Sequence, residues 1–399
     1  MGKMIPLSVP NFEGNEEKYV SDAVGQGWVS TAGAYIMRLE KQMATFLHTK
    51  TAVACQSGTS ALHLAMMECE IKPGDGVIVP TITFIAAVNP VTYVGAIPIF
   101  MDCDESLCID PLKVKAFCEN ECVLEQDQLY TKEGHILVKA IVPVHVFGNL
   151  CEMEKIMEIA AKYKLKVIED ATECLGSKFT TGKFIGRYGG TIGDFGAYSF
   201  NGNKIITTGG GGMLVSTNDE QLEHARYIST QAKDDLCFYI HHEIGYNYRM
   251  TNVQAAIGVA QMEELDEFIK RKRKNYEYYV HAFEDFSLAK LMKFREDTFS
   301  NCWFYSLLID IDQVELDLRK FVETLQERGI QTRPIWGLIH EQKPYQNSPN
   351  YQIEQAVYYS KRILNLPCST NITQPEMDAV VQTIKELLEE TAYDQRRTE

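Results

Sequence analysis

A short apolar run passes directly into a polar, turn-prone segment at residues 195–204, FGAYSFNGNK. The run is apolar along its whole length, as a strand covered on both faces of a sheet requires. Asn and Gly residues then favour a turn, and Lys204 stands just beyond the predicted end of the strand. In an open α/β sheet, ligands gather beyond the carboxyl ends of the strands. The segment therefore predicts such a sheet and a site at its edge.

Runs of the same kind recur along the N-terminal two-thirds of the chain and extend this prediction. Helix-length segments such as residues 151–163 separate them, which indicates parallel crossovers. We therefore expect an α/β fold with a mostly parallel central sheet covered by helices. The predicted strands are residues 77–80, 96–100, 140–144, 166–169, 195–200 and 212–215.

The pattern changes after about residue 250. A long helix is predicted from Thr251 past Leu265, followed by a strand, a helix and a closing helix at residues 303–309, 316–327 and 374–390. We expect residues 1–250 to form a large, ligand-binding α/β domain. Residues 251–399 should form a connecting helix and a smaller C-terminal α+β domain.

Composition excludes several classes of protein. The 399 residues are 45% hydrophobic and 23% charged, as in a globular protein with a sizeable core. No apolar run approaches the roughly 20 residues that span a bilayer, and the N-terminus lacks a secretory h-region. We therefore expect no membrane association and a cytoplasmic location. A net charge of −15 also argues against a nucleic-acid partner.

Two local features are interpreted conservatively. The basic run at 270–274 follows an acidic run at 263–267, which is typical of a solvated helix face rather than a binding patch. The eleven cysteines include no CxxC pair and no matching histidine spacing. We therefore expect no metal site, and reduced, mostly buried thiols.

Ser57-Gly58-Thr59-Ser60 stands directly before an apolar helical start. Small residues let the backbone approach an anion, and the free N–H groups and dipole of a helix N-terminus favour a phosphate. The alternative is an ordinary N-cap with no ligand.

Further candidates follow other predicted strands. Asp170 could face a pyridine nitrogen and keep it protonated, or it could cap the next helix. Glu173, one turn on, could contact a phenolic oxygen or lie at the surface. Phe84 could stack on a flat ring or belong to the core. Lys204 could lie near a cofactor aldehyde, or it could be an exposed loop lysine. His145 is interpreted as a satisfied polar residue without a catalytic role.

Together, in this order, these features resemble the sugar-nucleotide aminotransferases of the DegT/DnrJ/EryC1/StrS family, within the fold-type I pyridoxal-phosphate enzymes. The resemblance covers essentially the whole chain. Besides the segments above, it includes residues 25–33, 169–173, 245–250, 331–336 and 364–367.

The resemblance implies that Lys204 binds pyridoxal 5′-phosphate as a Schiff base. It also implies that Asp170 pairs with the pyridine nitrogen, that Phe84 stacks on the ring, and that Glu173 lies near its phenolic oxygen. Because all four residues lie before residue 250, the large N-terminal domain would be the domain that binds pyridoxal phosphate. The phosphate would be held by Gly58, Thr59 and Ser199.

The same resemblance implies a homodimer with shared active sites, because Asn247 would reach the phosphate in the neighbouring subunit. The nucleotide-sugar substrate would be lined by further candidates: Trp28, Thr31, Arg333 and His340.

Most members of this family carry a glutamate where this chain has Gly210. The segments 203–212 and 230–235 resemble the subgroup that makes legionaminic acid precursors. That subgroup implies transfer of an amino group from L-glutamate to carbon 4 of a nucleotide-linked 4-keto-6-deoxy sugar. The acceptor would be UDP- or GDP-linked 2-acetamido-2,6-dideoxy-hexos-4-ulose.

Three alternatives remain beside this one. A GDP-perosamine-type synthase would act on a 4-keto-6-deoxymannose. A pyridoxal-phosphate-binding regulatory protein would show no turnover. Sugar dehydratases resemble this family too, but they carry histidine at the position of Lys204, so the lysine argues against that reaction.

Overall fold

The computed structural model describes residues 4–235, 237–314 and 316–398, and its main feature is an eight-stranded sheet. Only β10 runs antiparallel to its neighbours, and the other pairs are parallel. The predicted fold class, a mostly parallel sheet covered by helices, is therefore confirmed. In spatial order the strands are β1 (Val53–Cys55), β10 (Gly212–Ser216), β9 (Phe195–Ser199), β7 (Lys166–Asp170), β6 (Val138–Ile141), β2 (Gly76–Pro80), β3 (Ile97–Met101) and β15 (Asn350–Tyr351).

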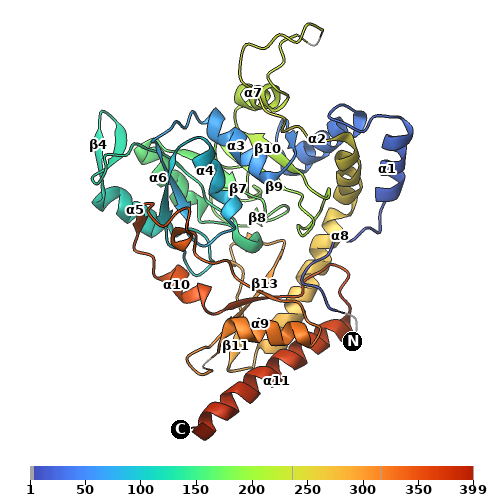
Figure 1. The fold of residues 1–399 in the computed structure, drawn as a ribbon, viewed down its shortest axis with the longest axis vertical. Coiled ribbons are helices and arrows are strands. Elements are labelled where there is room, and N and C mark those ends of the chain that lie inside the picture. Colours follow the sequence, from blue (N-terminus) through green and yellow to red (C-terminus); the bar gives the residue numbers. More distant parts are fainter. Residues whose placement is uncertain (1–3, 236, 315, 399) are drawn as a thin grey trace.

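Helices cover this sheet on both sides (Figure 1). The strands are apolar for that reason: every residue of β2 and of β1 is buried. The helix α3 packs on β9 and β10, and α6 packs on β7. The helices of this layer are α3 (Gly58–Glu68), α4 (Asn89–Tyr93), α5 (Pro111–Asn120), α6 (Met153–Tyr163) and α7 (Asp219–Ser229).

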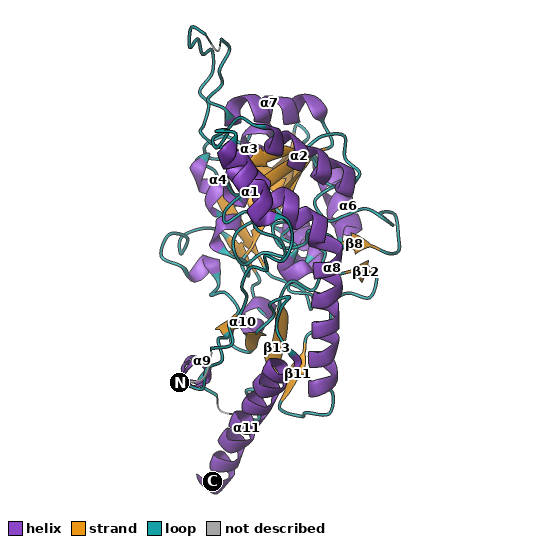
Figure 2. Ribbon diagram, turned by 90° about the vertical axis from the view of Figure 1, so that its right-hand side faces the viewer, coloured by secondary structure: helices purple, strands orange, loops and turns teal. Residues whose placement is uncertain are grey.

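A long helix, α8 (Asn252–Phe283), connects this layer to a second sheet (Figure 2). It begins with a capping box, in which the Thr251 and Gln254 side chains bond each other's backbone N–H groups. At one end it packs against α1 (Glu16–Gly25) and α2 (Ala34–Leu47), and at the other against α11 (Gln374–Thr398).

The second sheet is antiparallel and smaller. Its order is β11 (Ala289–Leu291), β13 (Tyr305–Ile309), β16 (Ile363–Leu366) and β14 (Arg333–Pro334). The helix α9 (Leu318–Glu327) lies between β13 and β14 in the chain, and α10 (Gln355–Ser360) precedes β16. Two further pairs lie outside both sheets: β4 (Cys122–Glu125) with β5 (Gln128–Thr131), and β8 (Lys178–Phe179) with β12 (Thr298–Phe299).

Segments on either side of the proposed domain boundary near residue 250 pair with segments on the other side. β15 comes from the C-terminal part but pairs with β3 of the large sheet. At the other end, Ile5 forms a bridge with Ile330. The division into two domains at this residue therefore stays a prediction.

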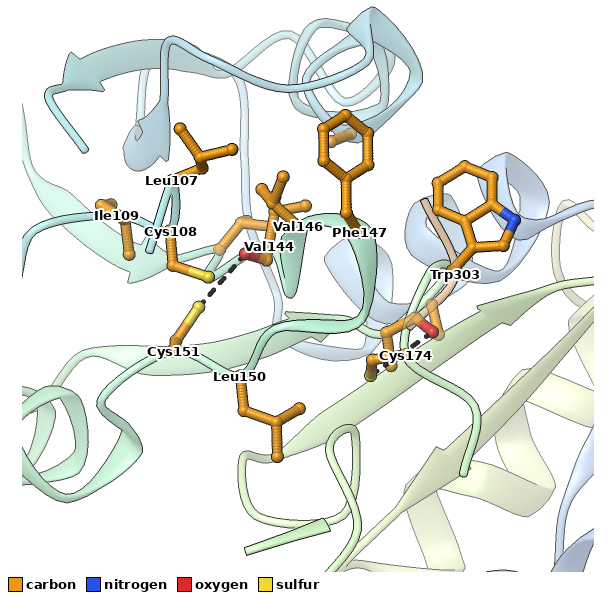
Figure 3. Close-up of a cluster of buried hydrophobic side chains, with 14 of the residues drawn as sticks. Leu107, Cys108, Ile109, Val144, Val146, Phe147, Leu150, Cys151, Cys174 and Trp303 are labelled. Atoms are coloured by element: carbon orange, nitrogen blue, oxygen red, sulfur yellow. Dashed lines mark hydrogen bonds between the residues drawn. The ribbon is translucent and has the colours of Figure 1, made fainter. Parts of the chain in front are cut away.

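A buried cluster beneath the strand ends contains several of the cysteines (Figure 3). The Cys151 thiol donates a hydrogen bond to the Val144 carbonyl at 3.2 Å, and Cys108 and Cys174 are also buried. Phe147 and Trp303 belong to the same cluster. Ten of the cysteines are buried and Cys237 is exposed.

Among the described helices, none combines the length and the apolar character needed to cross a bilayer.

Candidate active site

A cavity of about 570 Å³ lies at the carboxyl ends of the large sheet's strands. Its lining includes eight of the residues singled out from the sequence. They are Gly58, Thr59, Phe84, Asp170, Glu173, Ser199, Lys204 and Arg333.

Lys204 lies in the loop between β9 and β10, where its N–H closes a turn on the Asn201 carbonyl at 3.0 Å. Only 12% of its side chain is exposed. Its Nζ lies 3.5 Å from Oε1 of Glu173 and 4.0 Å from the centre of the Trp303 ring. The exposed-lysine alternative is therefore wrong, since this side chain is packed inside the cavity.

Asp170 is the last residue of β7 and is buried beside Lys204 in the same cavity. One carboxylate oxygen accepts the Thr172 N–H at 3.0 Å. Burial raises the pKa of Asp170 above its usual value, while the Thr172 hydrogen bonds and the charge of Lys204 oppose that rise. The carboxylate stays available to a cationic group placed in the cavity.

Glu173 is buried as well, so its predicted surface alternative is wrong. Its Oε2 accepts the Phe147 N–H at 2.8 Å. Phe147 has a φ of 56°, in the left-handed region that bulky residues rarely adopt. Burial raises the pKa of Glu173 to about 7, although the charge of Lys204 and the Phe147 hydrogen bond both lower this pKa.

The N-terminus of α3 forms another part of the lining. Ser57 caps the helix by accepting the Ser60 N–H at 3.0 Å, so the N-cap predicted as an alternative is present. Within the described chain, the N–H groups of Gly58 and Thr59 have no acceptor. A β-carbon at position 58 would lie 2.9 Å from the Thr172 methyl group and 3.0 Å from Cβ of Ser199. Only glycine allows this close packing, which keeps the helix N-terminus at the cavity wall.

Phe84 follows β2, and 55% of it is exposed even though it lines the cavity. The alternative of a buried core phenylalanine is therefore wrong. An aromatic face open to a cavity can stack on a flat ligand.

His145 confirms the conservative interpretation. It is fully buried, and its Nε2 lies 2.9 Å from a carboxylate oxygen of Glu169. Its other ring nitrogen accepts the Cys151 N–H at 3.2 Å. Both nitrogens are thus occupied outside the cavity, and no capacity remains for a ligand.

Four candidates lie outside the lining of this cavity. Trp28, Thr31 and Asn247 are exposed. His340 is half-buried, and its Nδ1 lies 2.6 Å from the Thr81 hydroxyl.

An aromatic wall from the C-terminal part of the chain was not predicted from the sequence. Trp303 stacks on Phe304 with ring centres 4.1 Å apart and planes at 10°. The Trp303 Nε1–H also donates to the Asn203 carbonyl at 2.7 Å. Trp336 completes the wall. Trp303 and Phe304 begin the predicted strand at 303–309, where aromatic residues usually indicate core, so no signal in the pattern distinguished them.

In the described residues, no group of three or more His, Cys, Asp or Glu side chains is arranged to hold a metal ion. The charged side chains that line this cavity are two carboxylates, Asp170 and Glu173, and two cations, Lys204 and Arg333. Such a set suits an organic cofactor and amine chemistry.

This fold is also found in a solved structure that is named as an aminotransferase. A DegT DnrJ EryC1 StrS aminotransferase from Brucella abortus matches with a TM-score of 0.83 at 25% identity, covering 94% of this chain and 95% of that chain. The fold and the charged cavity therefore define an aminotransferase. The model of the DegT/DnrJ/EryC1/StrS aminotransferase family matches residues 10–385, and the chain belongs to that family.

Curated relatives are similar along nearly the whole chain. The GDP-perosamine synthase of Escherichia coli O157:H7 is 38% identical, covering 96% of this chain and 98% of that protein. EpsN of Bacillus subtilis (strain 168), whose name includes "pyridoxal phosphate-dependent aminotransferase", is 34% identical over 97% of this chain and 96% of its own. Aminotransferases of this family use pyridoxal phosphate, so this chain is a pyridoxal phosphate-dependent enzyme.

The residues present fit that cofactor. A helix N-terminus with free N–H groups and a glycine that admits close approach suits a phosphate. A buried carboxylate suits a protonated pyridine nitrogen, and a lysine that lies within the cavity suits an aldehyde. These three features line one cavity.

The pKa of Glu173 leads to a prediction about stability in the absence of cofactor. The folded chain binds the Glu173 proton more tightly than the unfolded chain, because the pKa rises from 4.5 to about 7. The free energy of unfolding should therefore fall as the pH rises through this interval. Glu173→Gln, which has no proton to lose, should remove roughly 3 kcal/mol of this fall, since one pKa unit corresponds to about 1.4 kcal/mol.

The measurement is urea unfolding of both proteins at pH 5 and pH 8. Glu133→Gln, at an exposed position, is the matched control and should keep the wild-type pH dependence. Equal pH dependence in Glu173→Gln and the wild type would show that Glu173 does not hold the proton.

Proposed function

We propose that this enzyme transfers an amino group from L-glutamate to carbon 4 of a nucleotide-linked 4-keto-6-deoxy sugar. The favoured acceptor is UDP- or GDP-linked 2-acetamido-2,6-dideoxy-hexos-4-ulose, a precursor type of legionaminic acid and related surface glycans. The observation that carries the proposal is the convergence of Lys204, Asp170 and Glu173 in one cavity with the N-terminus of α3. The family membership and the perosamine synthase relatives support a sugar acceptor.

When bound, the cofactor supplies an aldehyde for the lysine and a ring that accepts electrons from the substrate carbon. We propose that the Lys204 Nζ bonds the cofactor between turnovers and carries the proton that moves during the transfer. Its neighbours suit that role, since Glu173 lies 3.5 Å from Nζ. Asp170 would hold the proton on the ring nitrogen by its negative charge. Glu173 would hold or release a proton close to pH 7 near the phenolic oxygen.

Other residues would orient the ligands. We propose that the N–H groups of Gly58 and Thr59, with Ser199, bind the phosphate, and that Phe84 stacks on the ring. Arg333, also at the cavity wall, would contact the substrate. Trp28, Thr31 and His340 remain candidates for the nucleotide part of the substrate, which extends beyond the reacting sugar.

Asn247 is proposed to act in a homodimer. It is exposed and lies outside the cavity of its own chain. The segment before it projects beyond α7 (Figure 1), and its apolar residues Phe238, Tyr239 and Ile244 are 76%, 72% and 86% exposed. Large exposed apolar residues on a projecting loop are typical of a protein–protein contact. A second copy of the chain would cover them and bring Asn247 to the neighbouring phosphate.

Gly210 bears on the choice of sugar. It lines the cavity, and a β-carbon there would meet only Nε2 of Gln254, at 3.9 Å. The missing side chain therefore leaves space in the cavity that Lys204 also lines. We propose that this space accommodates the 2-acetamido group.

A GDP-perosamine synthase is the second candidate function, because curated relatives with that name are 34–38% identical. Such an enzyme would use a 4-keto-6-deoxymannose, which lacks the acetamido group. A regulatory protein without turnover explains neither the buried lysine nor the aminotransferase family match.

The test is a screen of UDP- and GDP-linked 4-keto sugars with L-glutamate as donor, read by mass spectrometry. We expect an aminated product from an acceptor with a 2-acetamido group. Amination of the GDP-linked 4-keto-6-deoxymannose alone would establish the perosamine function instead. No product from any 4-keto sugar would contradict the proposal.

A further inference from the structure

The basic run on α8 does not form one solvated face. Lys272 is buried, and its Nζ donates to the Trp303 carbonyl at 2.8 Å and also to the Cys368 carbonyl. Arg271 pairs with Glu13 and Glu267. The conservative interpretation from the sequence is therefore wrong for Lys272. The other three residues, Lys270, Arg273 and Lys274, line a second groove.

This groove has a volume of about 470 Å³ and lies between α8 and the β8–β12 pair. It shares no lining residue with the Lys204 cavity. Its uncharged lining residues are apolar or aromatic: Phe46, Gly176, Tyr188, Ile269 and Phe299. A groove of this size suits a small-molecule ligand.

The groove carries an excess of positive charge. Its four cations are Lys178 and the three residues of α8, against two carboxylates, Asp266 and Glu277. Among the described residues, no carboxylate pairs with Lys178, Arg273 or Lys274, while Lys270 makes one long contact with Glu267 at 3.5 Å. In a chain with a net charge of −15, such a group of uncompensated cations stands out.

Aromatic rings hold two of these cations in place of carboxylates. The Arg273 guanidinium lies 4.3 Å from the centre of the Phe299 ring. The Lys178 Nζ lies 5.7 Å from the same ring and 5.9 Å from that of Tyr188. A ring face attracts a cation without neutralising its charge, so both cations stay able to bind an anion.

The backbone also holds the Arg273 side chain and the main chain of Lys178 in place. Arg273 Nη1 donates to the Ser300 carbonyl at 2.9 Å, and Ser300 follows β12. Lys178 and Phe299 are paired residues across the β8–β12 ladder. A binding group held before the ligand arrives loses less entropy on binding.

We propose that this groove binds a phosphate-bearing small anion, with Arg273 and Lys178 as its principal contacts. A guanidinium matches two phosphate oxygens at once, and an ammonium adds a point charge. A nucleic acid would need a long basic stripe, whereas Asp266 and Glu277 interrupt this surface. The phosphate could belong to a free diphosphate or to a nucleotide.

The test uses the enzyme saturated with pyridoxal phosphate, so that the cofactor's own phosphate site is filled. Binding of inorganic pyrophosphate, UDP and uridine is measured by titration calorimetry at low and physiological salt. We expect pyrophosphate and UDP to bind more weakly at higher salt, and uridine not to bind. Arg273→Gln and Lys178→Gln should each weaken binding by roughly 10-fold or more, as expected for a lost hydrogen bond to a charged group.

Two controls separate this groove from the active site. Lys183→Gln, an exposed loop lysine, should leave binding unchanged, and Arg333→Gln should affect the Lys204 cavity alone. Tighter binding of UDP than of pyrophosphate, lost in Arg273→Gln, would indicate a nucleotide, and equal binding would indicate the phosphate groups alone. Pyrophosphate binding that survives both groove variants, or that is lost only in Arg333→Gln, would overturn the proposal.

Discussion

Lys204→Ala is expected to abolish transamination, with a loss in kcat/KM of at least about 10³-fold, because in the proposed mechanism this one residue would supply both the covalent bond to the cofactor and the proton transfer. No second amine can replace it, since Lys204 is the only lysine among the residues that line the described cavity. The packing against Trp303 and Glu173 shows that its position is built into the fold.

Absorbance gives a measurement that needs no sugar. The wild-type enzyme should show the visible band of the lysine-bound cofactor and lose it when L-glutamate is added. Lys204→Ala should show neither the band nor the response, and Lys183→Ala should behave as wild type. Full sugar amination by Lys204→Ala would contradict the proposed mechanism.

Asp170→Asn is expected to lower kcat by about 10²–10³-fold, the range found when one preorganised charge-stabilising group is removed. Asparagine has nearly the same shape and can still accept the Thr172 N–H. The variant therefore removes the negative charge and little else. Because burial already raises the pKa of Asp170, the folded state should not lose stability when the charge is removed.

Steady-state kinetics and thermal unfolding together test this role. We expect a large loss in kcat with an unchanged or higher Tm. Asp110→Asn is the matched control, since Asp110 caps α5 outside the cavity and asparagine caps a helix equally well. Wild-type kcat in Asp170→Asn would show that the charge does not serve the reaction.

The apolar runs in the sequence were enough to predict the large sheet, at whose edge the candidate active site lies. Runs apolar along their whole length fit strands buried on both faces, and the strands β2, β3, β6, β7, β9 and β10 appear where such runs stand. Short strands such as β1, β8 and β12 were not predicted from the sequence. Each of them pairs with a strand from a distant part of the chain.

The site itself was determined only in part by the sequence. Asp170, Lys204 and the Gly58–Thr59 turn were predicted because each follows a strand or begins a helix, and a sheet brings such positions to one edge. The sequence left a structural alternative open for each of these residues, and only the packing of the folded chain could decide between the two interpretations. Whether Glu173 is buried, and whether Phe84 faces a cavity, depends on neighbours from other elements of the fold, such as Phe147 and Lys204 around Glu173.

For the basic run on α8, the sequence alone established only five successive cations on one helix. The tertiary structure gave them three different environments: the buried carbonyls around Lys272, the carboxylates around Arg271, and the aromatic groove at Arg273. The physical reason is that a side chain's charge is local, whereas what compensates it comes from whichever elements fold against it. The same reason applies to the candidate active site. The sequence is enough to predict that Lys204 is important, whereas the groups that surround Lys204 are determined by the fold.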